Sequence, residues 1–210
     1  MAHLVDGVLS APVLVGGSAV AAAAIAYGLR QIDGERLPYV GLMSAAFFVA
    51  SLVHVPVGPS NVHLILNGLL GIVLGWAAVP AIFVGLLLQA VFFGFGGITV
   101  LGVNTLIMAL PGMVCALAFA RPLRRGCSPV LLGAASGALA VAGTALTAGA
   151  ALALSGAEFL PAAKLVLAAH LPVIAVEAVI TATVVAFLHR VKPEVLSLPL
   201  RLTEERPRHA

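Results

Sequence analysis

Long apolar runs, separated by short polar stretches, make up most of the chain as far as His189. A helix of about 20 apolar residues crosses the hydrocarbon core of a bilayer. Seven runs approach or exceed this length, at residues 9–29, 38–56, 62–77, 80–95, 101–120, 129–155 and 161–188. The pattern predicts an all-α, polytopic integral membrane bundle of about seven transmembrane helices.

Two of these runs carry more specific expectations. The third and fourth are short and are separated only by residues 77–80, so they are expected either to span separately or to form a tight hairpin that does not cross the full thickness. In the sixth run, small residues recur every four positions, a pattern that favours close helix contact in lipid. They are Gly133 and Gly137, then Ala145, Gly149 and Ala153.

Composition supports the membrane assignment. Hydrophobic residues make up 61% of the 210 and charged residues only 9%, against about 25% charged residues in a typical soluble domain. The net charge of +3 gives no indication of nucleic-acid binding. Cys115 and Cys127 fit neither a redox motif nor a zinc site and are expected to be unpaired thiols. We expect one membrane domain over residues 1–190 and a loosely ordered tail over 191–210.

The distribution of Lys and Arg predicts the orientation in the cytoplasmic (inner) membrane. With the N-terminus outside and the C-terminus in the cytoplasm, ten of the 11 Lys and Arg residues lie inside, and only Lys164 lies outside. The segment Met1–Asp6, the turn before His63 and the glycine loop 94–99 then share the external side. No basic residue precedes the first apolar run, so the start is not a typical signal peptide, and it is expected to persist apart from Met1.

His3 is the most informative position for chemistry. Removal of Met1 before the small Ala2 would make His3 the second residue. The Ala2 amine, the His3 amide nitrogen and a His3 ring nitrogen then form a chelate of three coplanar nitrogens, which suits Ni(II), Cu(II) or low-spin Co(II). A histidine from a neighbouring external loop is the expected fourth ligand. An ordinary terminal histidine without a metal is the alternative.

Other polar residues are predicted to gather near the same boundary. His63 begins the third run and is the candidate fourth ligand, although a histidine hydrogen-bonded to a carbonyl at the interface is also possible. Residues that suit either support of the ligands or ordinary packing are His54, Asn67, Gln89 and Asn104. Asn67 is expected one helical turn from His63 on the same face of a helix.

His170 and Glu177 lie two turns apart on one face of the seventh run. A carboxylate inside a membrane is costly, so it indicates function by default, although structural pairing is the simpler explanation. The sequence contains no GxSxG, HExxH or P-loop motif, so no enzyme is predicted. Transport energy would have to come from a partner or an ion gradient.

The chain resembles the CbiM/NikM-type subunits of energy-coupling-factor (ECF) transporters, which bind cobalt or nickel. The residues that carry the resemblance are the start HLVDGVLS at 3–10, the segments 54–64 and 67–71, the glycine loop GGITVLGVNT at 96–105, and His170-Leu171-Pro172 with Glu177. The combination of HxxDGxL with GGxTxLGxN is specific. Relatives usually begin Met-His, whereas this chain begins Met-Ala-His, and removal of Met1 restores the register.

The resemblance implies a seven-helix capture subunit whose N-terminal plug, residues 1–8, inserts into the bundle and forms part of a planar nitrogen site there. The implied ligands are Ala2, through its terminal amine, His3 and His63. The implied partners are a membrane coupling (T-type) subunit, a pair of cytoplasmic ATPases and a small accessory membrane subunit. Co²⁺ or Ni²⁺ would be the transported substrate, and the sequence does not separate the two. A vitamin-type ECF capture subunit and a non-transporting membrane scaffold remain as alternatives.

Overall fold

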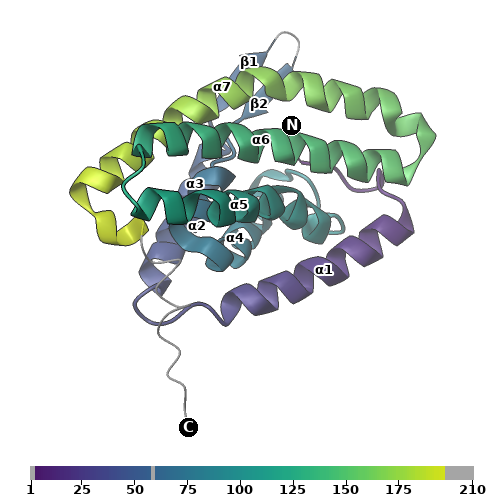
Figure 1. Ribbon diagram of the computed structural model, residues 1–210. Coiled ribbons are helices and arrows are strands. Elements are labelled where there is room, and N and C mark those ends of the chain that lie inside the picture. Colours follow the sequence, from purple (N-terminus) through teal and green to yellow (C-terminus); the bar gives the residue numbers. More distant parts are fainter. Residues whose placement is uncertain (1–2, 58–59, 197–210) are drawn as a thin grey trace.

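The computed structural model describes residues 3–57 and 60–196, with only the backbone described for 54–57 and 60–62. The elements follow one another as the helices α1 (Ala11–Leu29) and α2 (Leu37–Ala50), the strands β1 (His54–Val57) and β2 (Ser60–His63), then α3 (Asn67–Leu74), the 3-10 turn η1 (Gly75–Ala77), α4 (Ala78–Phe93), α5 (Leu101–Arg124), α6 (Pro129–Ser155), the 3-10 turn η2 (Ala157–Phe159) and α7 (Leu160–Val191) (Figure 1). The prediction of an all-α bundle with seven helices is confirmed.

Five helical segments are long and apolar enough to cross a membrane. They are α1, the continuous stretch Asn67–Phe93, α5, α6 and the stretch Ala157–Val191. The remaining helix, α2, is equally apolar but has only 14 residues. The third and fourth predicted runs therefore correspond to α3 and α4, joined through η1 with a break at Gly75, whose φ of +56° favours glycine.

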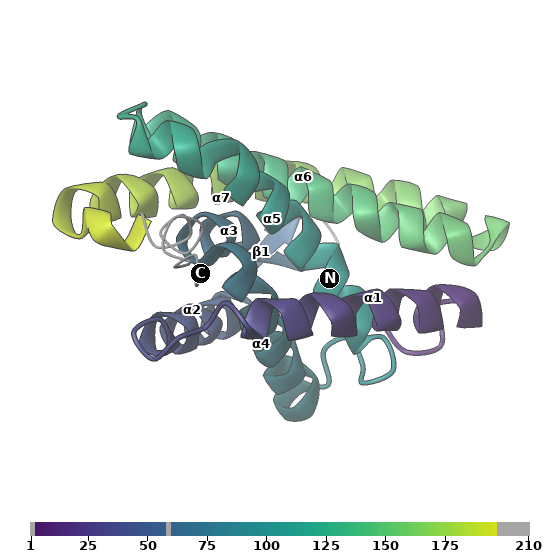
Figure 2. The same ribbon diagram turned by 60° about the horizontal axis from the view of Figure 1, so that its bottom comes forward.

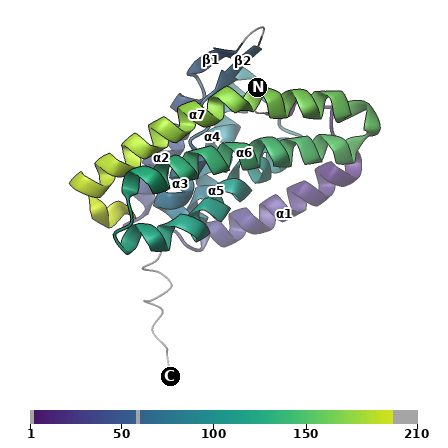
Figure 3. The same cartoon turned by 45° about the horizontal axis from the view of Figure 1, so that its top comes forward.

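The boundaries of the second and third predicted runs were wrong, because residues between them form a β-hairpin. Strands β1 and β2 pair antiparallel, with His54 opposite His63 and Val57 opposite Ser60. Pro56 has no N–H to donate within a helix, and the β-branched valines on either side of it favour an extended chain. The hairpin projects beyond α7 in Figure 3.

The short helix α3 occupies the centre of the bundle, and all eight of its residues are buried. Glycines allow its neighbours to approach closely. A Cβ placed on Gly71 would lie 2.0 Å from the Gly112 carbonyl oxygen in α5, and one on Gly68 would lie 2.6 Å from the Ser136 carbonyl oxygen in α6. Figure 2 shows α6 and α7 on one side of this centre and α1 on the other, with α5 between them.

The long helices α6 and α7 pack side by side, as the four-residue pattern of small residues predicted. A Cβ on Gly133 would lie 2.8 Å from the Ala182 Cα, and one on Gly137 would lie 2.4 Å from the Glu177 carbonyl oxygen. The second half of the pattern differs. A Cβ on Gly149 would meet nothing closer than 3.8 Å, and Ala153 is exposed. The approach of α7 to these small residues is therefore closest in the half of α6 that faces Glu177.

The outer surface is apolar, as expected for a bundle surrounded by lipid. Large hydrophobic side chains are exposed on the outer helices, for example Val15 (70%), Leu131 (70%) and Leu165 (70%). Beyond α7, Val195 and Leu196 are buried against the bundle, and residues 197–210 of the predicted tail lie outside the described part of the chain.

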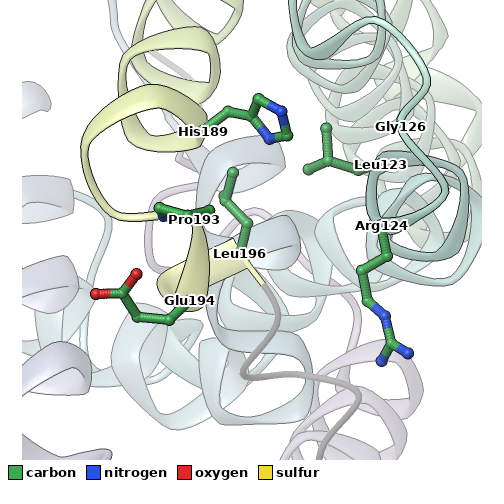
Figure 4. A pocket seen from close by; sticks show the side chains of 7 residues that line it. All are labelled: Leu123, Arg124, Gly126, His189, Pro193, Glu194 and Leu196. Carbon is green, nitrogen blue, oxygen red and sulfur yellow. The ribbon is translucent and has the colours of Figure 1, made fainter.

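A pocket of about 410 Å³ opens between the end of α5 and the end of α7 (Figure 4). Its lining residues are Leu123, Arg124, Gly126, His189, Pro193, Glu194 and Leu196. Neither His3 nor His63 belongs to it, so this pocket is separate from the predicted metal ligands.

Candidate metal centre

The N-terminal segment is held in the bundle by Asn104 near the start of α5. The Leu4 N–H donates to Asn104 Oδ1 at 3.0 Å, and Asn104 Nδ2 donates to the Leu4 carbonyl oxygen at 2.9 Å. Leu4 and Leu9 are both buried in the apolar core. Two hydrogen bonds and two apolar anchors thus fix a segment that has no regular secondary structure.

Asp6 ties the same segment to the N-terminus of α5. Its Oδ1 accepts hydrogen bonds from the Thr99 N–H at 3.2 Å, the Val100 N–H at 3.3 Å and the Thr99 hydroxyl. The first N–H groups of a helix have no partner within the helix, and a carboxylate there also interacts favourably with the helix dipole. Asp6 therefore caps α5 from a different part of the chain.

The glycine loop leaves room for these contacts. Gly96 has a φ of +77°, and a Cβ on it would lie 3.1 Å from Asn104 Nδ2 and 3.4 Å from His3 Cβ. A Cβ on Gly97 would lie 2.1 Å from the Asp6 Cγ. Both positions therefore need glycine because the N-terminal segment passes directly against the loop.

His3 and His63 meet at the end of this arrangement. Their rings stack with centroids 4.6 Å apart and an interplanar angle of 19°. Both side chains are buried, with exposed fractions of 5% and 2%. The structure thus brings together the two histidines that the sequence predicted as ligands, although 60 positions separate them in the chain.

His3 is held in the form that binds metals. Burial, together with the charges of His63 and the N-terminus, lowers the pKa of His3 to about 3, so the ring is neutral at ordinary pH. Within the described part of the chain, neither ring nitrogen of His3 has a hydrogen-bond partner. Buried polar atoms normally have partners, so such a pair of nitrogens calls for a ligand or ion.

The tautomer of His63 follows from its neighbour. Its Nδ1 lies 2.9 Å from the Leu64 carbonyl oxygen. A carbonyl oxygen can only accept, so Nδ1 carries a proton, and in the neutral form of the ring Nε2 then carries the lone pair. A hydrogen bond from one ring nitrogen to a carbonyl is the usual way in which a metal-binding histidine is oriented.

The three predicted amide side chains, Asn104, Asn67 and Gln89, differ in their hydrogen bonds. Asn104 holds Leu4, as described above. Asn67 donates from Nδ2 to the Met108 carbonyl oxygen at 2.8 Å and to Thr144 Oγ1 at 2.9 Å, and so links α3 to α5 and α6. Gln89 is fully buried, and among the described residues its side-chain amide has no hydrogen-bond partner.

The expectation that Asn67 and His63 share a helix face was wrong. His63 ends β2, and α3 begins only at Asn67, after residues 64–66. Leu66 has a φ of +55°, a left-handed conformation that interrupts any helix between the two. His63 and Asn67 therefore belong to different elements, and the helical spacing expected from the apolar pattern does not relate their side chains.

Two predicted residues lie where their side chains are not described. Ala2 lies outside the described residues, and of His54 only the backbone is described.

Cys115 is buried and Cys127 exposed, and both are free thiols as predicted. Within residues 3–57 and 60–196, no group of three or more His, Cys, Asp or Glu side chains could hold a metal.

His170 and Glu177 are both buried on α7, but they make separate contacts. His170 Nδ1 lies 2.7 Å from the Val166 carbonyl oxygen one turn earlier. Glu177 instead accepts hydrogen bonds from the backbone N–H groups of Ile65 and Leu66, just before α3. The carboxylate thus contacts the segment that follows His63.

Sequence reasoning missed the contribution of four residues to this region. Asp6 and Thr99 were noticed only as parts of motifs, and the N–H groups of Ile65 and Leu66 were not noticed at all. The motifs themselves indicated the first two residues. HxxD places Asp6 three residues after His3, and GGxT places Thr99 three residues after Gly96. Backbone donors leave no trace in side-chain patterns.

The chain is similar to known metal transport proteins over most of its length. Residues 3–195 match the family described as "Cobalt uptake substrate-specific transmembrane region". A "Putative metal transport protein" of Haemophilus influenzae is 43% identical over 199 residues, which cover 93% of this chain and 97% of that protein. The "Fused nickel transport protein NikMN" of Rhodobacter capsulatus is 43% identical over 126 residues, which cover 56% of this chain and 36% of that protein.

Solved structures are similar as well. A crystal structure of a transition metal transporter superposes with a TM-score of 0.78 at 28% identity, covering 95% of this chain and 99% of that one. A truncated transition metal transporter gives 0.77 at 29% identity, covering 90% and 98%. These relatives favour metal transport over the vitamin-type and scaffold alternatives. The chain belongs to the CbiM family of substrate-specific transmembrane components for cobalt and nickel uptake, a family of multi-pass transport proteins rather than enzymes.

Proposed function

We propose that this protein captures Co²⁺ or Ni²⁺ at the external face of the cytoplasmic membrane and delivers it inward as the substrate-specific subunit of an ATP-driven ECF-type transporter. The observation that carries the proposal is the buried stack of His3 on His63, with ring centroids 4.6 Å apart. Imidazole is the commonest protein ligand for such metals, and here two imidazoles from distant parts of the chain meet in a buried place.

Backbone nitrogens complete the proposed ligand set. The described residues offer no cluster of three ligating side chains, so two histidines alone would leave the metal under-coordinated. The amine of Ala2 and the amide nitrogen of His3 supply the missing donors when Met1 is removed. Four nitrogens in one plane suit Ni(II) and low-spin Co(II), and they suit Mg²⁺ poorly.

The N-terminal segment is the proposed moving part. It is joined to α5 by the Asn104–Leu4 pair and by the contacts of Asp6 with Thr99 and Val100. These bonds can break without unfolding any helix. Withdrawal of the segment, or tilting of the bundle, would separate His3 from His63 and release the metal.

The energy for release would come from other subunits. The sequence contains no nucleotide-binding motif. The resemblance to ECF capture subunits supports a coupling (T-type) membrane subunit, a pair of cytoplasmic ATPases and a small accessory membrane subunit as partners. The Lys and Arg distribution supports the orientation with the N-terminus outside. The pocket between α5 and α7 would then face the cytoplasm.

Metal analysis of the purified protein tests this function. We expect near-stoichiometric nickel or cobalt by mass spectrometry in the wild type, and loss of the metal in both His3→Ala and His63→Ala. His189→Ala, at the end of α7, is the matched control and should keep its metal. Full metal content in both site variants, or none in the wild type after loading, would contradict the proposal.

A further inference from the structure

One peptide group joins His63 to the buried carboxylate of Glu177. The carbonyl oxygen of Leu64 lies 2.9 Å from His63 Nδ1. The N–H of the same peptide group belongs to Ile65 and donates to Glu177 Oε1. A continuous line of hydrogen bonds therefore runs from the imidazole, across this peptide group, to the carboxylate.

The Glu177 carboxylate accepts hydrogen bonds from two successive backbone N–H groups just after His63. Besides Ile65, the Leu66 N–H lies 3.0 Å from Glu177 Oε1 and 3.2 Å from Oε2, so both carboxylate oxygens face the backbone just after His63. This local geometry also holds Leu66 in its left-handed conformation, with φ of +55°, which a leucine rarely adopts. An unusual backbone conformation persists only where its surroundings fix it.

The whole line is shielded from solvent. Ile65 and Glu177 are 0% exposed, and His63 is 2% exposed. Hydrogen bonds away from water are stronger electrostatically, and successive bonds polarise one another. Donation from Ile65 N–H to a carboxylate makes the Leu64 carbonyl oxygen a better acceptor, and that oxygen in turn holds the proton on His63 Nδ1.

We propose that Glu177 is a positioning residue for metal capture, which acts on His63 through the Leu64–Ile65 peptide group. It fixes the ring orientation, keeps Nε2 free of the proton and increases the electron density available to the metal. Metal-binding histidines commonly donate to a carboxylate directly, and substitution of such partners weakens metal binding about 10- to 100-fold. Here one peptide group stands between the two. The inference rests on the proposed function.

A purely structural role makes a different prediction. Glu177 also supplies acceptors for N–H groups at the start of α3, which have no partner within the helix. If that were its only role, substitution would lower the stability of the bundle and leave the properties of any bound metal unchanged. Affinity and the spectrum of the bound metal therefore distinguish the two roles, whereas stability does not.

The test compares Glu177→Gln with the wild type, using Ni²⁺ as the probe with the full chain in detergent. Glutamine has nearly the same shape but replaces one acceptor oxygen by a donor NH₂ facing the Leu66 N–H. We expect the dissociation constant for Ni²⁺ to rise about 10- to 100-fold, with a shifted visible absorption band. Glu158→Gln, an identical substitution in the exposed turn η2, is the matched control and should leave both unchanged.

A double-mutant cycle shows whether the effect passes through His63. In a His63→Ala background, Glu177→Gln should cause no further loss of the remaining Ni²⁺ affinity. Wild-type affinity and an unshifted band in Glu177→Gln would overturn the inference, as would a full additional loss in the His63→Ala background. If Glu177→Gln does not fold, Glu177→Asp, which keeps the charge but withdraws the oxygens, is measured by the same criteria.

The same samples separate this inference from the proposed function. A wild type that binds no Ni²⁺ or Co²⁺ overturns both. A wild type that binds metal and loses it in His63→Ala, together with a Glu177→Gln protein that binds as the wild type does, overturns only the role of Glu177.

Discussion

Asn104 and Leu4 exchange two hydrogen bonds, one in each direction, at 3.0 Å and 2.9 Å. A side-chain amide presents one acceptor and one donor, and the backbone of one residue presents the matching pair. Because Leu4 directly follows His3, this exchange determines where the His3 ring can lie. The stack on His63 therefore depends on a residue that touches neither ring through a hydrogen bond.

Asn104→Asp tests this dependence. The aspartate retains an acceptor for the Leu4 N–H but turns a second oxygen towards the Leu4 carbonyl oxygen, where two acceptors repel. We expect Ni²⁺ binding to weaken about tenfold, as for other groups that orient a ligand, mainly through faster release. Stopped-flow measurement of release to a chelator checks this. Gln31→Ala, in the loop between α1 and α2, is the control, and equal release rates would contradict the prediction.

Gly97→Ala should displace the N-terminal segment by another route. The added Cβ would lie 2.1 Å from the Asp6 Cγ, so the carboxylate would have to leave Thr99 and Val100. Loss of a capping carboxylate costs about 1 kcal/mol, and the segment that carries His3 would move as well. We expect lower metal content by mass spectrometry and a lower midpoint of thermal unfolding.

Gly41→Ala provides the matched control for that substitution. It adds the same methyl group to a glycine in α2 where nothing lies within 4 Å, so metal content should stay at the wild-type level. Equal metal content in Gly97→Ala and Gly41→Ala would mean that Asp6 can move without affecting His3.

Gly71→Ala should affect the bundle rather than the metal ligands. Its Cβ would lie 2.0 Å from the Gly112 carbonyl oxygen, which is backbone and cannot turn aside. Overpacking of this kind typically costs about 1–3 kcal/mol. We expect a lower thermal midpoint and a reduced yield of monodisperse protein, whereas Gly16→Ala on the open face of α1 should have neither effect. An unchanged midpoint in Gly71→Ala would show that α3 and α5 can separate freely.

The sequence predicted the long helices well because the thickness of the bilayer sets the length of the apolar run that a membrane-spanning helix needs. It did not predict the hairpin His54–Val57 and Ser60–His63, because a strand pair inside an apolar stretch has the same hydrophobicity as the helix ends that were expected. The pairing of His3 with His63 followed from the resemblance and from the external location of both. The link from Glu177 to Ile65 could not be foreseen, since its donors are backbone groups and its geometry depends on the left-handed Leu66.

The register of the N-terminus gives the last prediction. In the proposed ligand set, removal of Met1 lets the Ala2 amine, the His3 amide and the His3 ring supply three nitrogens, and His63 supplies the fourth. Intact-mass measurement should therefore find a chain that begins at Ala2, and His63→Ala should bind Ni²⁺ too weakly to keep it through purification. Insertion of one alanine between Ala2 and His3 changes this dependence, because the amine, two amides and the ring then form a complete set of four nitrogens. We expect the insertion variant to retain Ni²⁺ even in the His63→Ala background. Retention of metal by His63→Ala without the insertion, in a chain that keeps Met1, would show instead that the natural N-terminus binds the metal alone and that the stacked His63 serves only to seat it.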